Sequence, residues 1–258
     1  MRRTILLLSA GLVTLLCAGC AQFRLTDNVS PSHDRVFLFS TFDNGASVEW
    51  APVPDERYWT VVDGRYGLAD HAPNGIPQKT YSREPYWNGY LWQDYRVSAC
   101  LAFESSAEAW PPGLHDDSTS ILFRVVDEEN YMELRFEPWG WGVCQAFGPQ
   151  FLYPDGAPAG VVALYSHRDG EAVFLGHCPF GQLDESCHRV HIDLRGGTCL
   201  VYIGSSLCID TGDAYPLAGG IGLQTAAYHY PSQFLEKEEW HEVWFDDVYV
   251  RGFLDCTF

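Results

Sequence analysis

Short β-rich runs recur about every ten residues along this 258-residue chain, and they constrain its fold more than any other feature. Examples are YLWQDYRVSACLAF (90–103), NYMELRFEP (130–138) and CHRVHIDLR (187–195), bounded by Gly, Pro, Asn or Asp. Two intervening turns carry Asp-Gly, in VVDGRY and SHRDGEA, which is typical of tight hairpins. No long amphipathic helix interrupts the series. The pattern predicts one all-β domain, a two-sheet jelly-roll sandwich over residues 35–258.

The N-terminal segment MRRTILLLSAGLVTLLCAGC has the layout of an export signal, with two arginines, an apolar run over 5–16 and small residues before Cys20. The apolar run is too short to span a bilayer as a helix. Its AGC ending resembles the lipobox of bacterial lipoproteins, although Cys17 stands where that family usually has leucine. The resemblance implies a signal peptide over 1–19, a lipidated Cys20 and a polar tether over 20–34.

Lipidation predicts a cell-envelope protein, held by acyl chains such as palmitate at the outer membrane, on its periplasmic face or at the cell surface. Secretion with cleavage at another position is the alternative, and the arginine pair leaves a twin-arginine export route open. The formal net charge is −18, which excludes nucleic acid and anionic membrane surfaces as partners, because binding them needs clustered Lys and Arg. The same acidity also keeps a secreted protein soluble. Membrane association would therefore come from the lipid anchor.

Nine cysteines are present, and removing the signal peptide and lipidating Cys20 leaves seven. An odd number leaves at least one thiol without a partner in the chain. The cell envelope permits disulfides, and Cys178 and Cys187 flank the turn-rich stretch PFGQLDES, so they are the predicted pair. Cys199 and Cys208 flank a turn that would make them diagonal neighbours, about 7–8 Å apart. That separation is marginal for a bridge.

Several strand phrases follow one another over residues 36–252: FDNG, WTVVDGR, YRVSACLAF, ILFRVVDEENYMELRF, HRVHIDLRG, CLVYIG, GGIGL and VWFDDVYV. Their order resembles the concanavalin A-like lectin and glucanase superfamily, close to its laminin-G-like branch and to 3-keto-disaccharide hydrolase-type domains. The resemblance implies a jelly-roll sandwich and often carbohydrate contact. It rests on strand phrases rather than an active-site signature. Because the superfamily contains lectins, hydrolases and protein-binding modules, fold alone does not select a function.

One stretch, YMELRFEP, bears on catalysis, because Glu133, Arg135 and Glu137 share one face of a strand. Retaining glycosidases need two carboxyl groups about 5–5.5 Å apart, whereas the alpha carbons of Glu133 and Glu137 would lie about 13 Å apart. The superfamily's glucanases use a pattern like Glu-x-Asp-x-Glu, but Arg135 takes the middle position here. A guanidinium there should lower the pKa of both carboxyls, and an acid catalyst needs a raised pKa. The pattern favours an ion-paired, solvent-facing strand.

Aromatic residues in turn-like segments are the candidate ligand contacts, since sandwiches place ligands at loops and flat rings stack on sugars. They are Trp139 and Trp141 in EPWGWG, Trp110 in AWPPG, and Tyr86 and Trp87 in EPYWNG. The alternative is that these rings close the ends of the sandwich.

Asp43, in FDNG near the start of the domain, and Asp246, in WFDDV near its end, are candidate ligands of a structural Ca²⁺. First and last strands often neighbour one another in sandwiches, which would bring these carboxylates together. Turn capping by aspartate is the alternative explanation.

These features favour a lipoprotein whose domain binds a carbohydrate or another extracellular polymer without cleaving it. No catalytic residue is assigned, and the chain has neither GxSxG nor HExxH. A glycoside-acting hydrolase of the same fold and a protein-binding adhesion module remain as alternatives.

Overall fold

The computed structural model describes residues 36–45, 47–53, 55–69, 76–83, 91–105, 119–137, 160–180, 186–226, 228–230 and 239–253. Residues 1–35 form a unit separate from residues 36–258, and the predicted lipidation site Cys20 lies outside the described residues. Within the described part of the chain, no helix combines the length and the apolar character that a membrane span requires.

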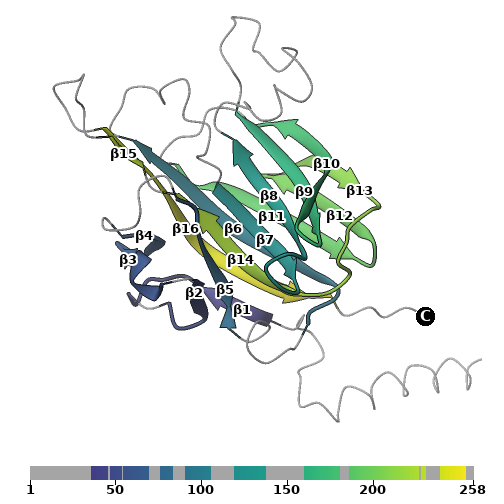
Figure 1. Ribbon diagram of the computed structural model, residues 1–258, viewed down its shortest axis with the longest axis horizontal. Coiled ribbons are helices and arrows are strands. Elements are labelled where there is room, and N and C mark those ends of the chain that lie inside the picture. The colour runs from purple at the N-terminus through teal and green to yellow at the C-terminus, as the bar shows by residue number, and fades with distance from the viewer. Residues whose placement is uncertain are drawn as a thin grey trace, which may run out of the picture. The chain divides into compact units, whose positions relative to one another are not determined.

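Two antiparallel sheets make up the domain (Figure 1). The nine-stranded sheet contains β1 (Val36–Ser40), β3 (Trp59–Val62), β4 (Arg65–Leu68), β6 (Tyr95–Ser105), β11 (His188–Arg195), β12 (Thr198–Ile203), β13 (Ser206–Thr211), β15 (Tyr228–Tyr230) and β16 (Glu239–Gly252). Its strand order is β13-β12-β11-β6-β16-β4-β3, with β1 and β15 also paired to β16.

The seven-stranded sheet contains β2 (Trp50–Val53), β5 (Gln78–Ser82), β7 (Thr119–Val125), β8 (Tyr131–Glu137), β9 (Val161–Arg168), β10 (Glu171–Pro179) and β14 (Gly220–Thr225). Its strand order is β10-β9-β8-β7-β14-β5-β2. One short 3-10 turn, η1 (Glu56–Tyr58), follows β2. The predicted all-β, two-sheet sandwich is confirmed.

The core lies between the sheets, and strict alternation along the central strands fills it. In β8, Met132, Leu134 and Phe136 are buried in the main hydrophobic cluster, so the intervening residues face away from the core. The facing strands β6 and β11 contribute alternate residues to the same cluster, among them Leu101 and Ile192. The outer face of the seven-stranded sheet is therefore defined by the odd-numbered residues of β8.

Both predicted Asp-Gly hairpins are present. Asp63 and Gly64 join β3 to β4 with φ of 49° and 77°, and Asp169 and Gly170 join β9 to β10 with φ of 51° and 81°. Two successive residues with positive φ give the turn a twist that matches that of the flanking strands.

The predicted Cys178–Cys187 bridge is wrong. The structure joins Cys100 to Cys187, with alpha carbons 5.3 Å apart, and Cys178 to Cys208, with alpha carbons 5.6 Å apart. Cys199 is a free, buried thiol. Proximity along the sequence was therefore a poor guide, because strand register decides which cysteines meet.

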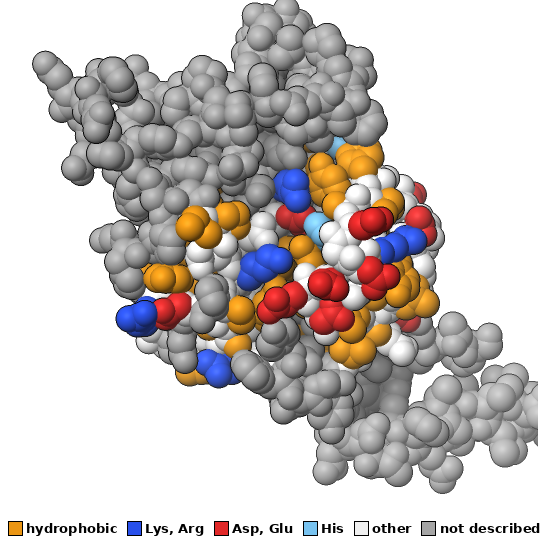
Figure 2. Space-filling view, in the orientation of Figure 1, with side chains coloured by type: hydrophobic (Ala, Val, Ile, Leu, Met, Phe, Trp, Pro, Cys, Tyr) orange, Lys and Arg blue, Asp and Glu red, His pale blue; other side chains and the backbone are white. Residues whose placement is uncertain are grey.

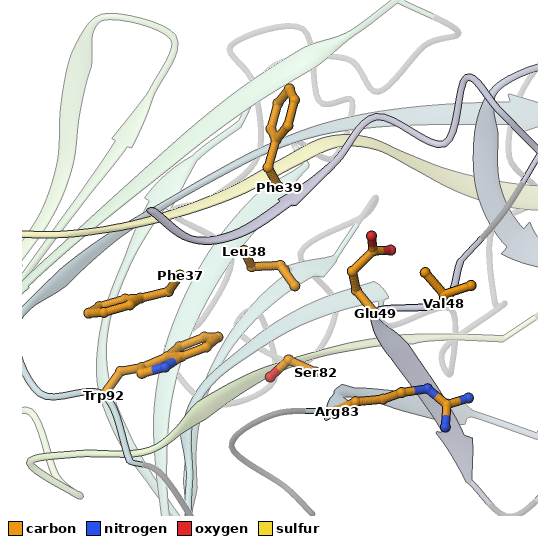
Figure 3. A pocket seen from close by; sticks show the side chains of 8 residues that line it. All are labelled: Phe37, Leu38, Phe39, Val48, Glu49, Ser82, Arg83 and Trp92. Atoms are coloured by element: carbon orange, nitrogen blue, oxygen red, sulfur yellow. The ribbon is translucent and has the colours of Figure 1, made fainter. Parts of the chain in front are cut away.

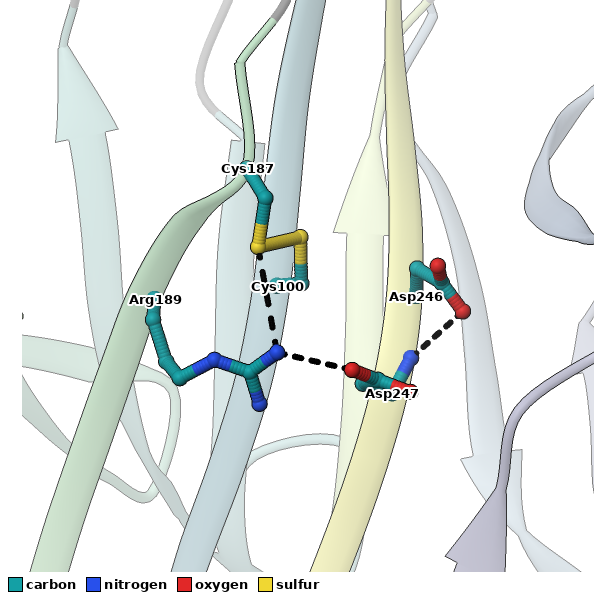
Figure 4. Close-up of a disulfide and its surroundings, with 5 residues drawn as sticks. All are labelled: Cys100, Cys187, Arg189, Asp246 and Asp247. Atoms are coloured by element: carbon teal, nitrogen blue, oxygen red, sulfur yellow. Dashed lines mark hydrogen bonds and ion pairs between the residues drawn. A yellow bond between two sulfur atoms is a disulfide. The ribbon is translucent and has the colours of Figure 1, made fainter.

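The register between β6 and β11 explains the first bridge. Cys100 on β6 lies opposite Arg189, so Cys187, two residues before Arg189, is the diagonal neighbour of Cys100 on the same face of the sheet. Figure 4 shows this bridge next to the ion pair between Arg189 and Asp247, whose closest N–O distance is 2.7 Å.

A β-bulge explains the second bridge. A two-residue turn alone would set Val201 opposite Cys208, but the register shifts within the β12–β13 pair, and Val201 lies opposite Ile209. Cys208 is the extra residue of the bulge, which re-aims its side chain. Because β10 and β13 are the outermost strands of their sheets, the Cys178–Cys208 bridge links the two sheets along one edge of the sandwich.

Candidate functional site

A pocket of about 330 Å³ opens at the other edge of the sandwich, where β1 of the nine-stranded sheet faces β5 and the approach to β2 of the seven-stranded sheet. We call it the edge pocket. It is lined by Phe37, Leu38, Phe39, Val48, Glu49, Ser82, Arg83 and Trp92 (Figure 3). Its size lies at the lower end of the range for ligand pockets, which favours a small ligand.

A bulge in β1 builds the aromatic wall of this pocket. Val36 lies opposite Arg251 and Leu38 opposite Val250, so Phe37 is the extra residue. Bulges re-aim side chains, and here the Phe37 ring stacks on Trp92 with centroids 5.1 Å apart and planes 7° apart. Simple alternation along β1 would not place neighbouring Phe37 and Leu38 on the same wall.

Trp92 is fixed by a backbone bridge to Gly219. The Gly219 amide donates to the Trp92 carbonyl at 2.9 Å, and the Trp92 amide donates back at 3.3 Å. A Cβ at Gly219 would lie 2.2 Å from the carbonyl carbon of Arg124, so only glycine fits there without displacement. The Trp92 ring also packs edge-on against Tyr95, at 5.9 Å between centroids. This anchoring leaves Trp92 only 7% exposed.

Polar groups occupy the opposite side of the edge pocket, where Figure 3 shows Glu49 and Arg83 across from Phe37 and Trp92. The Glu49 carboxylate accepts one hydrogen bond, from Ser40 Oγ at 3.3 Å. Among the described residues, neither the Arg83 guanidinium nor the Trp92 indole N–H has a hydrogen-bond partner. The pocket thus combines aromatic rings with one acceptor group and two donor groups.

Exposed apolar side chains border the edge pocket. Phe39 is 59% exposed and Val48 is 70% exposed, and the Phe39 ring rests edge-on against Tyr249 at 5.6 Å. Large apolar side chains gathered at a pocket mouth are typical of a binding surface.

The outer face of the seven-stranded sheet carries a second cluster, centred on Glu133. Its Oε1 accepts from Ser120 Oγ at 2.6 Å and from Arg135 Nε at 3.1 Å. Its Oε2 accepts from Arg135 Nη2 and from His167 Nε2, both at 2.8 Å. The predicted Glu133–Arg135 ion pair is confirmed. Figure 2 shows a face on which basic, acidic and histidine side chains lie close together near β8 and β9.

The prediction that this strand faces solvent is wrong, since Glu133 is only 1% exposed. Burial alone would raise the pKa of Glu133, but the hydrogen bond from His167, together with Arg135 and Ser120, lowers it to about 2. Glu133 is therefore a fixed anion at neutral pH. The Glu137 side chain lies outside the described residues, so its expected ion pair with Arg135 and its distance from the Glu133 carboxyl stay untested.

Asp43 and Asp246 approach each other closely enough to interact, as expected from the pairing of β1 with β16. Burial raises the pKa of Asp246, and the Asp247 and Asp43 carboxylates raise it further. The Asp247 carboxylate, however, already pairs with Arg189. Among the described residues, no three His, Cys, Asp or Glu side chains gather as a metal site. Since Ca²⁺ takes 6–8 oxygen ligands, these residues alone do not fit it, and calcium stays a prediction.

The five predicted ligand-contacting aromatics, Tyr86, Trp87, Trp110, Trp139 and Trp141, lie outside the described residues. Trp92 is buried, and strand periodicity is consistent with a core position for it. Its second role, as a wall of the edge pocket, was missed. That role depends on the bulge at Phe37 and the contact at Gly219, neither of which strand periodicity can show.

No protein-family model matches the sequence, and no curated protein is significantly similar to it. Solved structures with the same fold were found. Carbohydrate-binding module CBM66 from Bacillus subtilis matches with a TM-score of 0.50 and 12% identity, over 79% of this chain and 96% of its own. The exoplasmic/lumenal domain of VIP36, in a Ca²⁺- and mannose-bound form, matches with a TM-score of 0.57 and 10% identity, over 89% of this chain and 93% of its own.

A structure of an endo-acting O-glycanase of the human gut microbiota matches with a TM-score of 0.50 and 12% identity, over 85% of this chain and all of its own. At these identities the matches show the fold. The domain therefore has the jelly-roll sandwich shared by carbohydrate-binding modules, lectins and glycosidases, as the strand phrases implied.

Proposed function

We propose that the chain is an extracytoplasmic carbohydrate-binding protein that holds a neutral sugar ring in the edge pocket without cleaving it. The observation that carries this proposal is the composition of the pocket, with an aromatic wall on one side and Glu49 and Arg83 on the other. The fold supports it, because the structural neighbours include a carbohydrate-binding module and a lectin.

A neutral sugar suits the edge pocket for two reasons. The charges of Glu49 and Arg83 cancel, so the pocket does not select an ion. A sugar ring has an apolar face for aromatic contact and hydroxyl groups that both donate and accept hydrogen bonds. Those hydroxyls could donate to the Glu49 carboxylate and accept from the Arg83 guanidinium and the Trp92 indole N–H.

The environment of Glu133 argues against glycoside cleavage by the carboxyl groups of β8. A general acid must carry a proton near the working pH, and the pKa of Glu133 is about 2. Both carboxylate oxygen atoms of Glu133 accept hydrogen bonds, from Ser120, Arg135 or His167. This geometry favours binding over the glycoside-acting alternative.

The proposal includes a lipid anchor on Cys20, which the AGC sequence ending at this residue supports. Metabolic labelling with a fatty-acid analogue should mark the wild-type protein in the membrane fraction of the cell envelope and leave Cys20→Ser unlabelled. Equal labelling of both proteins would refute the lipid anchor without affecting the edge pocket.

The edge pocket is tested with the mature domain labelled at tryptophan with ¹⁵N. Simple methyl pyranosides (glucoside, galactoside, mannoside and xyloside) are titrated while the indole N–H resonance of Trp92 is followed, after its assignment through Trp92→Phe. At least one sugar should move this resonance saturably, since the N–H gains a partner. Glu49→Gln and Arg83→Met should each weaken that binding about five- to tenfold, as the loss of about one hydrogen bond implies.

Cyclohexanol is the matched control, because it has a six-membered ring of similar shape with a single hydroxyl. A stronger response to cyclohexanol than to every sugar would show a merely apolar pocket and favour the adhesion-module alternative. No response to any sugar would refute the edge pocket as a sugar site. Release of reducing ends from polysaccharides, measured in parallel, should be absent. If the wild-type protein releases reducing ends and Glu133→Gln does not, the protein is a hydrolase.

The aromatic residues predicted from sequence form a separate arm of this test. If the loops that carry them extend the binding surface for a longer glycan, then Trp87→Ala, Trp139→Ala and Trp141→Ala should each weaken polymer binding. Truncation of one stacked ring should cost about 1–3 kcal/mol. Binding of a methyl pyranoside at the edge pocket should stay unchanged in the same variants.

A further inference from the structure

The outer face of the seven-stranded sheet contains two polar groups that the Glu133 network does not use. Lys79 on β5 and Gln224 on β14 are directly paired in register, and Gln224 is paired in turn with Ser120 on β7. Directly opposed residues have Cβ atoms about 4.5–5.5 Å apart and point to the same face. The odd-numbered residues of β8 lie on this face too, because Arg135 is paired with Ser120.

The Lys79 ammonium is half-buried and has no carboxylate within ion-pair distance among the described residues. Nζ donates to the Tyr131 hydroxyl at 3.3 Å and lies 4.8 Å from the centroid of the Tyr131 ring. Burial lowers the pKa of Lys79, while Glu133 and Glu128 act in the opposite direction from a greater distance. A half-buried cation without a direct counter-charge is costly, so this position is suited to an incoming anion.

Gln224 adds a further hydrogen-bonding group next to Lys79. Its side chain is 8% exposed, yet its amide makes no hydrogen bond within the described part of the chain. The amide is not among the fully buried polar groups that lack a partner, so it still reaches solvent and can bind a ligand in place of water. The Tyr131 hydroxyl accepts from Lys79, and its own hydrogen has no described acceptor. Three groups that can donate hydrogen bonds therefore lie on one stretch of the sheet.

We propose that Lys79, Gln224 and Tyr131 form a second binding site, for the carboxylate or sulfate group of an acidic saccharide. An oxyanion only accepts hydrogen bonds, which matches three donors, and it supplies the charge that Lys79 lacks. A neutral hydroxyl would leave the ammonium uncompensated. This site differs from the edge pocket, whose two rim charges cancel.

Two features favour a saccharide over a free anion. The same face carries the half-buried aromatic rings of Tyr165 on β9 and Phe174 on β10, which offer apolar surface to a sugar ring. The chain has a formal net charge of −18, so a small anion gains little from the protein as a whole and needs further contacts to bind. A sugar ring attached to the anionic group supplies those contacts.

The test uses uronic-acid oligosaccharides (glucuronate, galacturonate and mannuronate series), each paired with its carboxyl-reduced, neutral form. Titration calorimetry on the mature domain should show at least one acidic member binding about tenfold more tightly than its neutral partner, as a charge-assisted hydrogen bond implies. Lys79→Met should remove that preference, and Lys79→Arg should keep most of it. Gln224→Leu should weaken the acidic member alone.

Arg195→Met is the matched control, since it removes an exposed cation from β11 of the other sheet and should leave the preference for the acidic saccharide intact. Sodium sulfate, tested alone, distinguishes a saccharide site from an anion site: equal affinity for sulfate would overturn the saccharide assignment. Equal binding of acidic and reduced forms, an unchanged preference in Lys79→Met, or no binding of any acidic member would overturn the proposal. The edge pocket is scored separately through the Trp92 resonance, so failure at one site does not count as failure at the other.

Discussion

The Glu133 cluster and the edge pocket both gather aromatic and polar side chains, but they differ in how many of those polar groups already have partners. Glu133 accepts hydrogen bonds from Ser120, Arg135 and His167 and is almost fully buried. In the edge pocket, Glu49 accepts one hydrogen bond and the Arg83 guanidinium has no partner among the described residues.

This difference separates groups that hold the fold together from groups that can exchange partners. A satisfied, buried charge network is rigid, and removing one member leaves the others unpaired. Groups at a pocket rim keep their bonds to water until a ligand replaces it. Lys79 and Gln224 lie on the same face of the sheet as the Glu133 network but their side chains make no described hydrogen bond to it, so they resemble the groups of the edge pocket.

The largest expected effect is on stability at the Glu133 cluster. Glu133→Ala should lower the free energy of unfolding by about 3–5 kcal/mol, because it leaves Arg135 without its buried counter-charge and His167 and Ser120 without their hydrogen-bond acceptor. Glu49→Ala, which removes the carboxylate of the edge pocket, should cost less than about 1 kcal/mol. Urea denaturation of both variants measures the contrast. Similar losses in the two proteins would remove the distinction between the regions.

Acid should expose the same contrast through the ionisation of Glu133. The pKa of Glu133 is lowered from 4.5 to about 2 in the folded protein, so ionised Glu133 stabilises the fold above pH 4.5. That stabilisation should be lost as the pH falls from 4.5 towards 2, by about 3 kcal/mol in total. Urea midpoints across this range should fall less steeply for Glu133→Gln than for the wild type. Parallel curves for the two proteins would assign the acid sensitivity to other groups.

A smaller loss of stability is expected at Gly219, whose backbone is bridged to Trp92 in the wall of the edge pocket. Gly219→Ala places a Cβ against the backbone of Arg124 and should cost about 1–3 kcal/mol. It should also weaken sugar binding, because Gly219 is bridged to Trp92. Gly212→Ala, where a Cβ would meet nothing within 4 Å, is the control and should change neither property. Unchanged sugar binding in a destabilised Gly219→Ala would show that the bridge does not position Trp92.

The sequence was informative wherever the deciding interaction is local. Alternation along the strands gave the two sheets, the Asp-Gly pairs gave both hairpins, and the two-residue spacing of Glu133 and Arg135 gave their ion pair. Each of these depends on residues close together in the chain. Local patterning could not give the burial of Glu133, since burial depends on what packs over the strand.

The errors and omissions come from register between distant strands. Cys187 meets Cys100 because of the pairing between β6 and β11, and Cys208 meets Cys178 because a bulge shifts β13. The edge pocket depends in the same way on the bulge at Phe37. A bulge adds a single residue and has no fixed sequence signature, yet it reverses the direction of the side chains beyond it.

The smallest expected effect on stability is at Arg83, which tests whether the side chains of the edge pocket contribute to the fold as those of the Glu133 cluster do. The Arg83 backbone amide donates to the Glu49 carbonyl at 2.8 Å, but its side chain is exposed and has no partner among the described residues. Arg83→Met should therefore leave the free energy of unfolding within about 0.5 kcal/mol of the wild type, at pH 7 and at pH 3 alike. The same substitution should weaken sugar binding at the edge pocket. A stability loss above about 1 kcal/mol would mean that the Arg83 side chain supports the fold, and the edge pocket would then resemble the Glu133 cluster instead of contrasting with it.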